Sequence, residues 1–319
     1  MTDIGPLEWI KLAIFYVSYL YVVAAPTAFW FAIIKDGVWR WGAILFLIVI
    51  TLLAYGRFVE PRILLTHEHN IALDTCFESS GAMRVAVFSD THNGLFKNAM
   101  PIKRIVKAVE ASKPDFTVIA GDFIYFLAPE WFEETFGPFA DLSAPVFAVL
   151  GNHDIGLPGP DLTAPLQAAL PVHGVRLIDN EALILSNSQF AIELVGLSDQ
   201  WGRRQDLTLL EPDLNKPRIV LTHNPATVRD FSTTTKTDLL IGGHTHGGQI
   251  QLPMVTCVMT GVCGDNASGL RMEKGVLIFT TPGTGMVGLP MRFRMPPRID
   301  MLNISYSRCP SYERDNFND

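Results

Sequence analysis

Five short apolar runs in this 319-residue chain each lead directly into residues that can bind a metal ion. The runs are rich in valine, isoleucine, leucine and phenylalanine, which is typical of buried β-strands. They are RVAVFS (84–89), DFTVIAG (115–121), PVFAVLG (145–151), RIVLT (218–222) and DLLIGG (238–243). An apolar repeat at helical spacing follows the first run, at Ile102, Ile105, Val106 and Val109. Strands that alternate with helices predict an α/β fold.

Further apolar runs add strands to this fold. EALILS (181–186) and QFAIELVGL (189–197) flank Asn187-Ser188 and predict a β-hairpin, and therefore some antiparallel pairing. GVLIFTT (275–281) and RIDMLNISY (298–306) predict the last two strands. RFVEPRILLTHEHN (57–70) is interpreted as a connector that precedes the domain.

The residues at the ends of the five runs are carboxylates, imidazoles and one amide. The tails DTH, GD, GNHD, HNP and GHTHGGQ contain the candidate site residues Asp90, His92, Asp122, Asn152, His153, Asp154, His223, His244 and His246. Because open α/β sheets build their sites at the carboxyl ends of strands, we expect these side chains to lie together. Each tail alone has an ordinary explanation as a strand cap, a turn or a helix start. GNHD is moderately specific and GHTHGGQ strongly so, and the ordered set of five, which holds five of the eight histidines, is very specific.

Two glycine pairs surround His244 and His246 in GGHTHGG (242–248). Fixing a glycine backbone costs conformational entropy, so four glycines this close together indicate a specific need. A His-x-His pair can direct both imidazoles at one bound group, and the glycines let the backbone approach it. Mixed imidazole and carboxylate donors suit Mn²⁺, Fe or Zn²⁺, whereas Mg²⁺ and Ca²⁺ prefer oxygen donors alone.

Two long apolar runs near the N-terminus predict a membrane hairpin. Leu12–Ile34 carries no charge, and Trp41–Gly56 reaches spanning length if Arg40 and Arg57 extend to the interfaces. KDGVWR (35–40) would join the two helices. A cleaved signal peptide would have a shorter apolar region and a basic start, and buried helices of a soluble domain would show a polar face. Basic residues on the two sides nearly balance, so they do not define the orientation.

These features divide the chain into an anchor and connector (1–62), one domain (63–308) and a polar tail (309–319). Residues 1–62 carry five basic and four acidic side chains, a net charge of +1. Because the whole chain has a net charge of −7, the remaining residues carry −8. An acidic domain does not favour nucleic-acid binding. The cysteines form no CxxC pair and no disulfide framework, which favours a reducing compartment, although Cys257 and Cys263 could form a bridge. The four are Cys76, Cys257, Cys263 and Cys309.

The order D-x-H, GD, GNHD, H and GHxH resembles that of the calcineurin-like metallophosphoesterases, over about Arg84 to Tyr306. GHTHGGQIQLP and TPGTGMVGLPMRFRMPP are similar to a membrane-attached bacterial branch, which includes enzymes acting on UDP-2,3-diacylglucosamine in lipid A synthesis. The resemblance implies a four-layer αββα sandwich. It also implies a hydrolase in which a metal-activated hydroxide attacks phosphorus directly.

The resemblance implies a role for each candidate residue. One divalent ion would be held by Asp90, His92, Asp122 and His246. A second would be held by Asp122, Asn152, His223 and His244, so that Asp122 bridges the two. His153 would act on the leaving oxygen, and Asp154 is a catalytic candidate by adjacency alone. Protein phosphatases of the family carry an aspartate where this chain has Tyr125, which argues against that activity and leaves the orientation of His153 open.

A lipid-linked phosphodiester or pyrophosphate is the expected substrate, because a water-soluble nucleotide needs no membrane anchor. UDP-2,3-diacylglucosamine is the leading example, and it would place the domain on the cytoplasmic face of the bacterial inner membrane. A broad phosphodiesterase or phosphatase is the alternative. An inactive membrane scaffold is a remote one, because no expected ligand is missing.

Two segments keep two interpretations each. The aromatic stretch 123–139 either packs a helix on the sheet or uses some of Phe126, Trp131 and Phe132 to form an acyl-chain groove or to touch the bilayer. The late arginines either grip phosphate or lipid headgroups or form a solvated loop. They are Arg292, Arg294 and Arg298. His67, His69 and His173 lie outside every motif and are interpreted as surface or connector residues.

Overall fold

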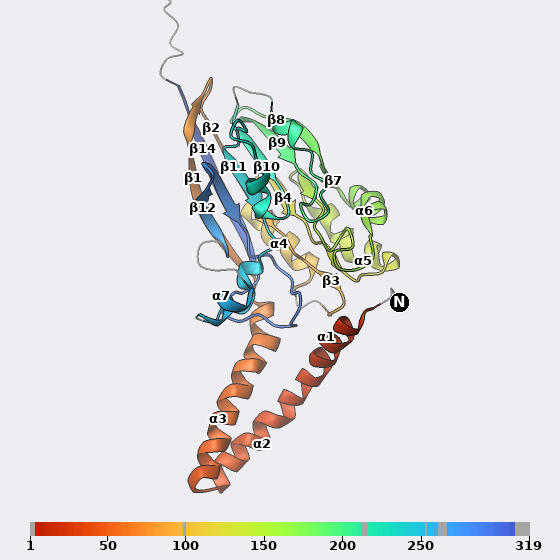
Figure 1. The fold of residues 1–319 in the computed structure, drawn as a ribbon, viewed down its shortest axis with the longest axis vertical. Coiled ribbons are helices and arrows are strands. Elements are labelled where there is room, and N and C mark those ends of the chain that lie inside the picture. The colour runs from red at the N-terminus through yellow and green to blue at the C-terminus, as the bar shows by residue number, and fades with distance from the viewer. Residues whose placement is uncertain (1–3, 98–99, 212–215, 253, 261–266, 310–319) are drawn as a thin grey trace, which may run out of the picture.

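The computed structural model describes residues 4–97, 100–211, 216–252, 254–260 and 267–309. They form two six-stranded sheets and a helical hairpin (Figure 1). The first sheet has the order β1 (Leu65–Phe77), β14 (Arg298–Arg308), β2 (Gly81–Phe88), β4 (Phe116–Ala120), β6 (Val146–Val149), β7 (Val175–Leu177). The second has the order β12 (Gly269–Glu273), β13 (Val276–Thr280), β11 (Leu239–Gly242), β10 (Arg218–Leu221), β9 (Ala191–Gly196), β8 (Glu181–Ser186). A short pair joins β3 (Asn93–Gly94) to β5 (Ile124–Tyr125).

The strands that carry the candidate tails are parallel to one another within each sheet. β2, β4 and β6 are parallel neighbours in the first sheet, and β10 and β11 are parallel neighbours in the second. The hairpin predicted at Asn187-Ser188 is the antiparallel pair of β8 and β9. All the strands expected from the sequence are therefore present.

The core lies between the two sheets and on their outer faces. Alternate residues of the strands, such as Val85, Val118 and Ile219, pack between the sheets. The outer face of the first sheet is covered by α4 (Ile102–Ser112), α5 (Phe132–Phe136) and α6 (Thr163–Ala169). The outer face of the second is covered by the 3₁₀ turns η7 (Leu207–Leu210) and η8 (Pro225–Asp230). The predicted four-layer sandwich is confirmed, with 3₁₀ turns in place of α-helices in the fourth layer.

The segment expected to be a connector is partly a strand. β1 runs parallel to β14, with Leu65 opposite Arg298 and Ile71 opposite Ile304. The connector interpretation is therefore wrong from Leu65 onward. The local sequence did not signal this strand, because its partner lies at the other end of the domain.

The expectation that the four cysteines form no disulfide framework is also wrong. Cys76, at the end of β1, forms a disulfide with Cys309, 233 residues later. Cys257 is disulfide-bonded as well, and Cys263, its expected partner, lies outside the described residues. The tail beyond Cys309 is outside the described residues too. Because disulfides persist in oxidising compartments, the inference of a reducing compartment loses its basis.

The N-terminal residues form the predicted hairpin (Figure 1). Its helices are α1 (Pro6–Val17), α2 (Tyr21–Ile34) and α3 (Gly37–Ala54), and α2 packs on α3. The spans Pro6–Ile34 and Gly37–Arg62 are long and apolar enough to cross a membrane. The loop between α2 and α3 is shorter than the expected KDGVWR segment, because α3 already begins at Gly37.

The hairpin contacts the domain at its base. Arg57, expected to extend to an interface, is buried instead, with its guanidinium 4.1 Å from the ring of Phe15 and its Nε donating to Ser18 Oγ over 3.1 Å. Phe15 also stacks on Phe96 of the domain, with ring centroids 5.5 Å apart. Figure 1 shows the hairpin leaving the end of the domain where β3 and α7 (Val255–Thr260) lie.

Candidate metal centre

The seven residues expected to bind metal come together at the carboxyl ends of five strands. Asp90 and His92 follow β2, Asp122 follows β4 and Asn152 follows β6. The remaining three follow β10 and β11 of the second sheet, so both sheets contribute; they are His223, His244 and His246. All but His244 are almost completely buried.

The first expected group is in contact through its ligand atoms. Asp90 Oδ1 lies 3.3 Å from His246 Nε2 and 3.6 Å from His92 Nε2. The two imidazoles face each other, with their Nε2 atoms 2.9 Å apart. Asp122 Oδ2 completes the group at 3.5 Å from His92 Nε2.

The second expected group shares the same aspartate. Asp122 Oδ2 also lies 3.2 Å from His223 Nε2. Asn152 Oδ1 is 3.1 Å from His223 Nε2 and 3.0 Å from His244 Nδ1. One oxygen of Asp122 therefore stands between both groups, as a bridging ligand would.

The donor set fits divalent cations. Asp90 Oδ1 is buried and makes no hydrogen bond to any described residue, although buried polar atoms are nearly always satisfied. The Nε2 atoms of His92 and His246 point at each other, and a cation between such lone pairs would satisfy both. His223 Nδ1 lies 2.7 Å from the carbonyl of Ala120, which directs Nε2 into the cluster as a metal-binding histidine requires.

The backbone at the cluster is strained. Five of the seven residues have a left-handed φ, between 44° and 66°. Non-glycine residues adopt this conformation rarely, and it accumulates at functional sites. The glycines allow close approach: a Cβ on Gly243 would lie 2.4 Å from Ser89 Oγ and 2.6 Å from Asp90 Oδ2. Likewise, a Cβ on Gly151 would lie 2.2 Å from Asp122 Oδ1.

The electrostatics hold the carboxylates as anions. Burial alone would raise the pKa of Asp122, but the neighbouring histidines, His223 first among them, hold it well below its usual value. Burial would lower the pKa of His223, but Asp122 outweighs it and raises the pKa. Burial, and then the proximity of His223, lowers the pKa of His244 to about 4.

His153 lies beside the cluster and is held by backbone and ring contacts. Its N–H donates to Asp122 Oδ1 over 2.9 Å, and its Nδ1 lies 3.3 Å from the carbonyl of Pro158. Its ring stands edge-on to those of Tyr125 and His92, with centroids 4.8 and 4.9 Å apart. Pro158 and Tyr125 thus orient His153, which the sequence had left open. Burial lowers the pKa of His153 to about 3.

Asp154 lies beneath the loops that carry the cluster. Its carboxylate accepts hydrogen bonds from the backbone N–H groups of Gly151, Ile124 and Phe123, at 2.9, 3.1 and 3.3 Å. Burial, and then the charge of Asp122, raises the pKa of Asp154 to about 8. These contacts tie the GD loop to the GNHD loop.

Two aromatic residues contact the cluster, and the sequence had assigned a contact to neither of them. Trp201, in the loop after β9, stands edge-on to His244 with ring centroids 4.6 Å apart, and 55% of it is exposed. Tyr125 joins the cluster to the hairpin, because its hydroxyl accepts a hydrogen bond from Lys11 of α1 over 2.6 Å. Tyr125 therefore contacts both the first apolar helix and His153, and connects the two.

Two of the three late arginines are held inside the protein, which leaves only Arg294 for a phosphate grip or a solvated loop. Arg292 is fully buried and donates to the carbonyls of Gly285, Met295 and Pro282, over 2.8, 3.0 and 3.1 Å. Arg298 pairs with Asp300, and Arg294 alone is exposed.

The aromatic stretch 123–139 mainly packs on the sheet. Phe132 and Phe136 are buried in the core beneath α5, whereas Trp131 is half-exposed. The packing interpretation is thus confirmed for Phe132, whereas Phe126 lies outside this core cluster. Among the remaining histidines, His173 is buried, contrary to expectation, and His69 pairs with Asp300.

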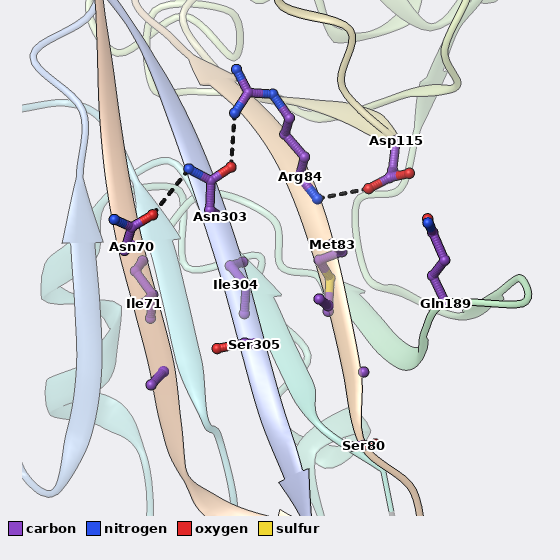
Figure 2. A pocket seen from close by; sticks show the side chains of 13 residues that line it. Asn70, Ile71, Ser80, Met83, Arg84, Asp115, Gln189, Asn303, Ile304 and Ser305 are labelled. Atoms are coloured by element: carbon purple, nitrogen blue, oxygen red, sulfur yellow. Dashed lines mark hydrogen bonds between the residues drawn. The ribbon is translucent and has the colours of Figure 1, made fainter.

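A separate pocket of about 930 Å³ lies over β1, β14 and β2, away from the cluster (Figure 2). Its polar groups bind one another. Arg84 Nη1 donates to Asn303 Oδ1 over 2.8 Å, and Asn303 Nδ2 donates to Asn70 Oδ1 over 3.1 Å. The backbone N–H of Arg84 donates to Asp115 over 2.7 Å. Because these groups are already paired, we assign no ligand to this pocket.

Two packed sheets with an Asp, His and Asn cluster at their common edge define a metal-dependent phosphoesterase. Residues 83–248 match the calcineurin-like phosphoesterase family, and the chain belongs to this family of hydrolases.

Relatives of known name cover most of the chain. Phosphodiesterase YaeI of Escherichia coli K12 is 30% identical over 264 residues, which span 78% of this chain and 92% of that protein. The metallophosphoesterase YkuE of Bacillus subtilis 168 is 29% identical over 257 residues, or 78% and 88%. UDP-2,3-diacylglucosamine pyrophosphatase LpxG of Chlamydia trachomatis serovar D is 26% identical over 306 residues, or 79% and 92%.

Proposed function

We propose that this chain is a membrane-anchored phosphoesterase with two divalent metal ions that hydrolyses a phosphodiester or pyrophosphate in a lipid-linked substrate. The observation that carries the proposal is the contact between the cluster and the hairpin. Lys11 of the first apolar helix binds Tyr125, whose ring lies against His153. A reactive phosphorus that stays at a bilayer surface would meet the cluster there.

Two groups of ligands would hold the metals. Asp90, His92, Asp122 and His246 would bind one ion, and Asp122, Asn152, His223 and His244 the other. Bound there, a pair of divalent ions lowers the pKa of a water molecule and neutralises charge on the phosphoryl oxygens. Mn²⁺ is the first choice for this donor set, with Fe and Zn²⁺ as alternatives.

The residues around the ions would direct the reaction. Hydrolysis adds the oxygen of water to phosphorus and breaks the bond to the leaving oxygen, without a covalent enzyme intermediate. His153, oriented by Pro158 and Tyr125, would donate a hydrogen bond that stabilises the charge developing on that leaving oxygen, because its lowered pKa keeps the imidazole neutral. Asp154 would act by position, because it holds the loops of Asp122 and His153 together.

UDP-2,3-diacylglucosamine is the first named substrate that we propose. The similarity to LpxG of Chlamydia supports it, and so does the apolar hairpin. Hydrolysis would release UMP and a lipid monophosphate. With this substrate, the chain would be a two-span protein of the inner membrane with its domain on the cytoplasmic face, where nucleotide-linked precursors occur.

The disulfides favour a second candidate. Cys76–Cys309 and the bridge of Cys257 would persist outside the cytoplasm. A domain on that side would meet lipid phosphoesters without a nucleotide. The chemistry and the ligands would be the same, and the leaving group would differ.

One experiment separates the two candidates. The full chain in lipid nanodiscs with Mn²⁺ is given UDP-2,3-diacylglucosamine, a lipid phosphodiester without a nucleotide and a soluble phosphodiester, with the His153→Ala protein as control. Release of UMP by the wild type but not by His153→Ala supports the first candidate. Cleavage of the lipid phosphodiester without release of UMP supports the second. Cleavage of the soluble ester only would contradict a lipid-linked substrate. Protease digestion of intact spheroplasts then shows which face carries the domain.

A further inference from the structure

An apolar groove of about 410 Å³ opens directly from the cluster. Its inner end is formed by His244 and His246, two of the expected metal ligands. Its outer end is formed by Leu252 and Leu289, which are 42% and 44% exposed. The volume lies within the usual range for small-molecule sites. The residues between the two ends are Thr245, Gly248, Gln249, Ile250, Val255, Thr256 and Val287.

The polar groups of the groove are engaged by the protein itself. The side-chain amide of Gln249 donates to the carbonyls of Val287 and Leu289, both over 2.9 Å, and its Oε1 accepts from Val287 N over 2.9 Å. Thr256 Oγ1 donates to Ile250 O and accepts from Leu252 N over 2.8 Å. Among the described residues, no Asp, Glu, Lys or Arg lines the groove. What it offers a ligand is therefore hydrocarbon surface.

The groove is also joined to the end of the second apolar helix. Beyond Leu289 its wall continues into the loop that holds Phe293, which packs edge-on against Tyr55 with ring centroids 6.4 Å apart. In the same loop, Arg292 N donates to Gly56 O over 2.9 Å. A chain that leaves a bilayer beside α3 would meet the outer end of the groove and could follow it to the cluster.

We propose that this groove holds one acyl chain of a lipid phosphoester while the phosphorus of that lipid lies at the metal cluster. The inference rests on the proposed function and assigns the acyl chain a place. That place differs from the aromatic stretch 123–139, where four of the five phenylalanines are buried in the core of the first sheet. A second copy of the chain is a less suitable occupant, because the groove is continuous with the cluster that must receive substrate.

Substitution at the outer end tests the groove by turnover. Leu252→Asn and Leu289→Asn are compared with Leu270→Asn, a leucine of β12 that is 39% exposed and lies outside the groove. The measured quantity is kcat/KM for a lipid phosphodiester divided by that for a soluble one. Burying a leucine side chain is worth about 10- to 100-fold in affinity. We expect the ratio to fall by at least about 10-fold in the first two proteins and to stay unchanged in Leu270→Asn.

Acyl-chain length gives an independent measure. Each methylene buried adds about fourfold in affinity, so the wild-type KM should rise by that factor for each methylene removed. A KM that is independent of chain length, or the same loss in all three variants, would overturn the proposal.

A binding measurement needs no turnover. The full chain in nanodiscs, treated with chelator, is photolysed with a phosphoester whose acyl chain carries a diazirine. Adducts on the peptides that contain Leu252 and Leu289 would support the groove. If the separate turnover assay with Mn²⁺ then showed no cleavage of any ester, the proposed function would fail and the groove would stand. Adducts elsewhere, or between two copies of the chain, would overturn the groove while cleavage of the soluble ester still supported the metal centre.

Discussion

Gly243→Ala should damage the metal centre through one added methyl group. A Cβ at this position would lie 2.4 Å from Ser89 Oγ and 2.6 Å from Asp90 Oδ2, closer than real Cβ contacts allow. Ser89 Oγ donates to that same Asp90 oxygen, and His244 N donates to it over 3.1 Å. The methyl group must therefore displace a ligand carboxylate or break its hydrogen bonds. Overpacking of this kind costs about 1–3 kcal/mol of the free energy of unfolding.

Two measurements separate the effects of this substitution. In chelator, the melting temperature should fall by roughly 2–12 °C, since 1 kcal/mol corresponds to about 2–4 °C for a domain of this size. With Mn²⁺ restored, metal affinity should fall by about 10- to 100-fold, as for loss of a group that orients a ligand. Gly137→Ala is the matched control, because nothing lies within 4 Å of its added Cβ and its φ is −44°. If Gly243→Ala bound Mn²⁺ and melted like Gly137→Ala, the close packing described around Asp90 would be refuted.

Three further predictions address the ligands, the buried arginine and the disulfide. Asp122→Ala should lose both metal ions and all turnover, whereas His153→Ala should keep the metals and lose about 10²- to 10⁴-fold in kcat, as elemental analysis and kinetics would show; equal metal loss in both would refute the separate roles. Arg292→Lys should lower the free energy of unfolding by at least about 3 kcal/mol in a denaturant titration, because an ammonium group cannot reach three carbonyls as the guanidinium does, and a wild-type midpoint would contradict this. Cys76→Ser should cost about 2–5 kcal/mol, since its bridge to Cys309 closes a loop of more than 200 residues. When both proteins are reduced, Cys76→Ser and wild type should have the same free energy of unfolding, and a difference that persists would argue against the bridge.

The cluster of expected metal ligands could be predicted from the sequence because every ligand closely follows a strand. A buried apolar run predicts a strand from local residues alone, and the parallel strands then bring their ends to one edge. Asp90, Asp122 and His223 are far apart in the chain, yet all three meet as expected. The same reasoning located the two apolar spans, since hydrocarbon thickness sets a length that a sequence shows directly.

Features that depend on contacts between residues far apart in the chain could not be predicted from the sequence. β1 looks like a connector because its partner, β14, lies more than 200 residues away, and the Cys76–Cys309 bridge follows only from that pairing. Arg292 looks like a surface residue by composition, but the fold surrounds it with carbonyl groups. The contact of Lys11 with Tyr125 requires the hairpin to be placed on the domain, which no local pattern specifies.

The most direct test of the metal centre is anomalous diffraction from crystals of the full chain loaded with Mn²⁺. We expect two peaks about 3.5–4 Å apart, with Asp122 between them. One peak should lie beside Asp90, His92 and His246, and the other beside Asn152, His223 and His244. A single peak, or peaks away from the carboxyl ends of β2, β4 and β10, would contradict the two-metal site.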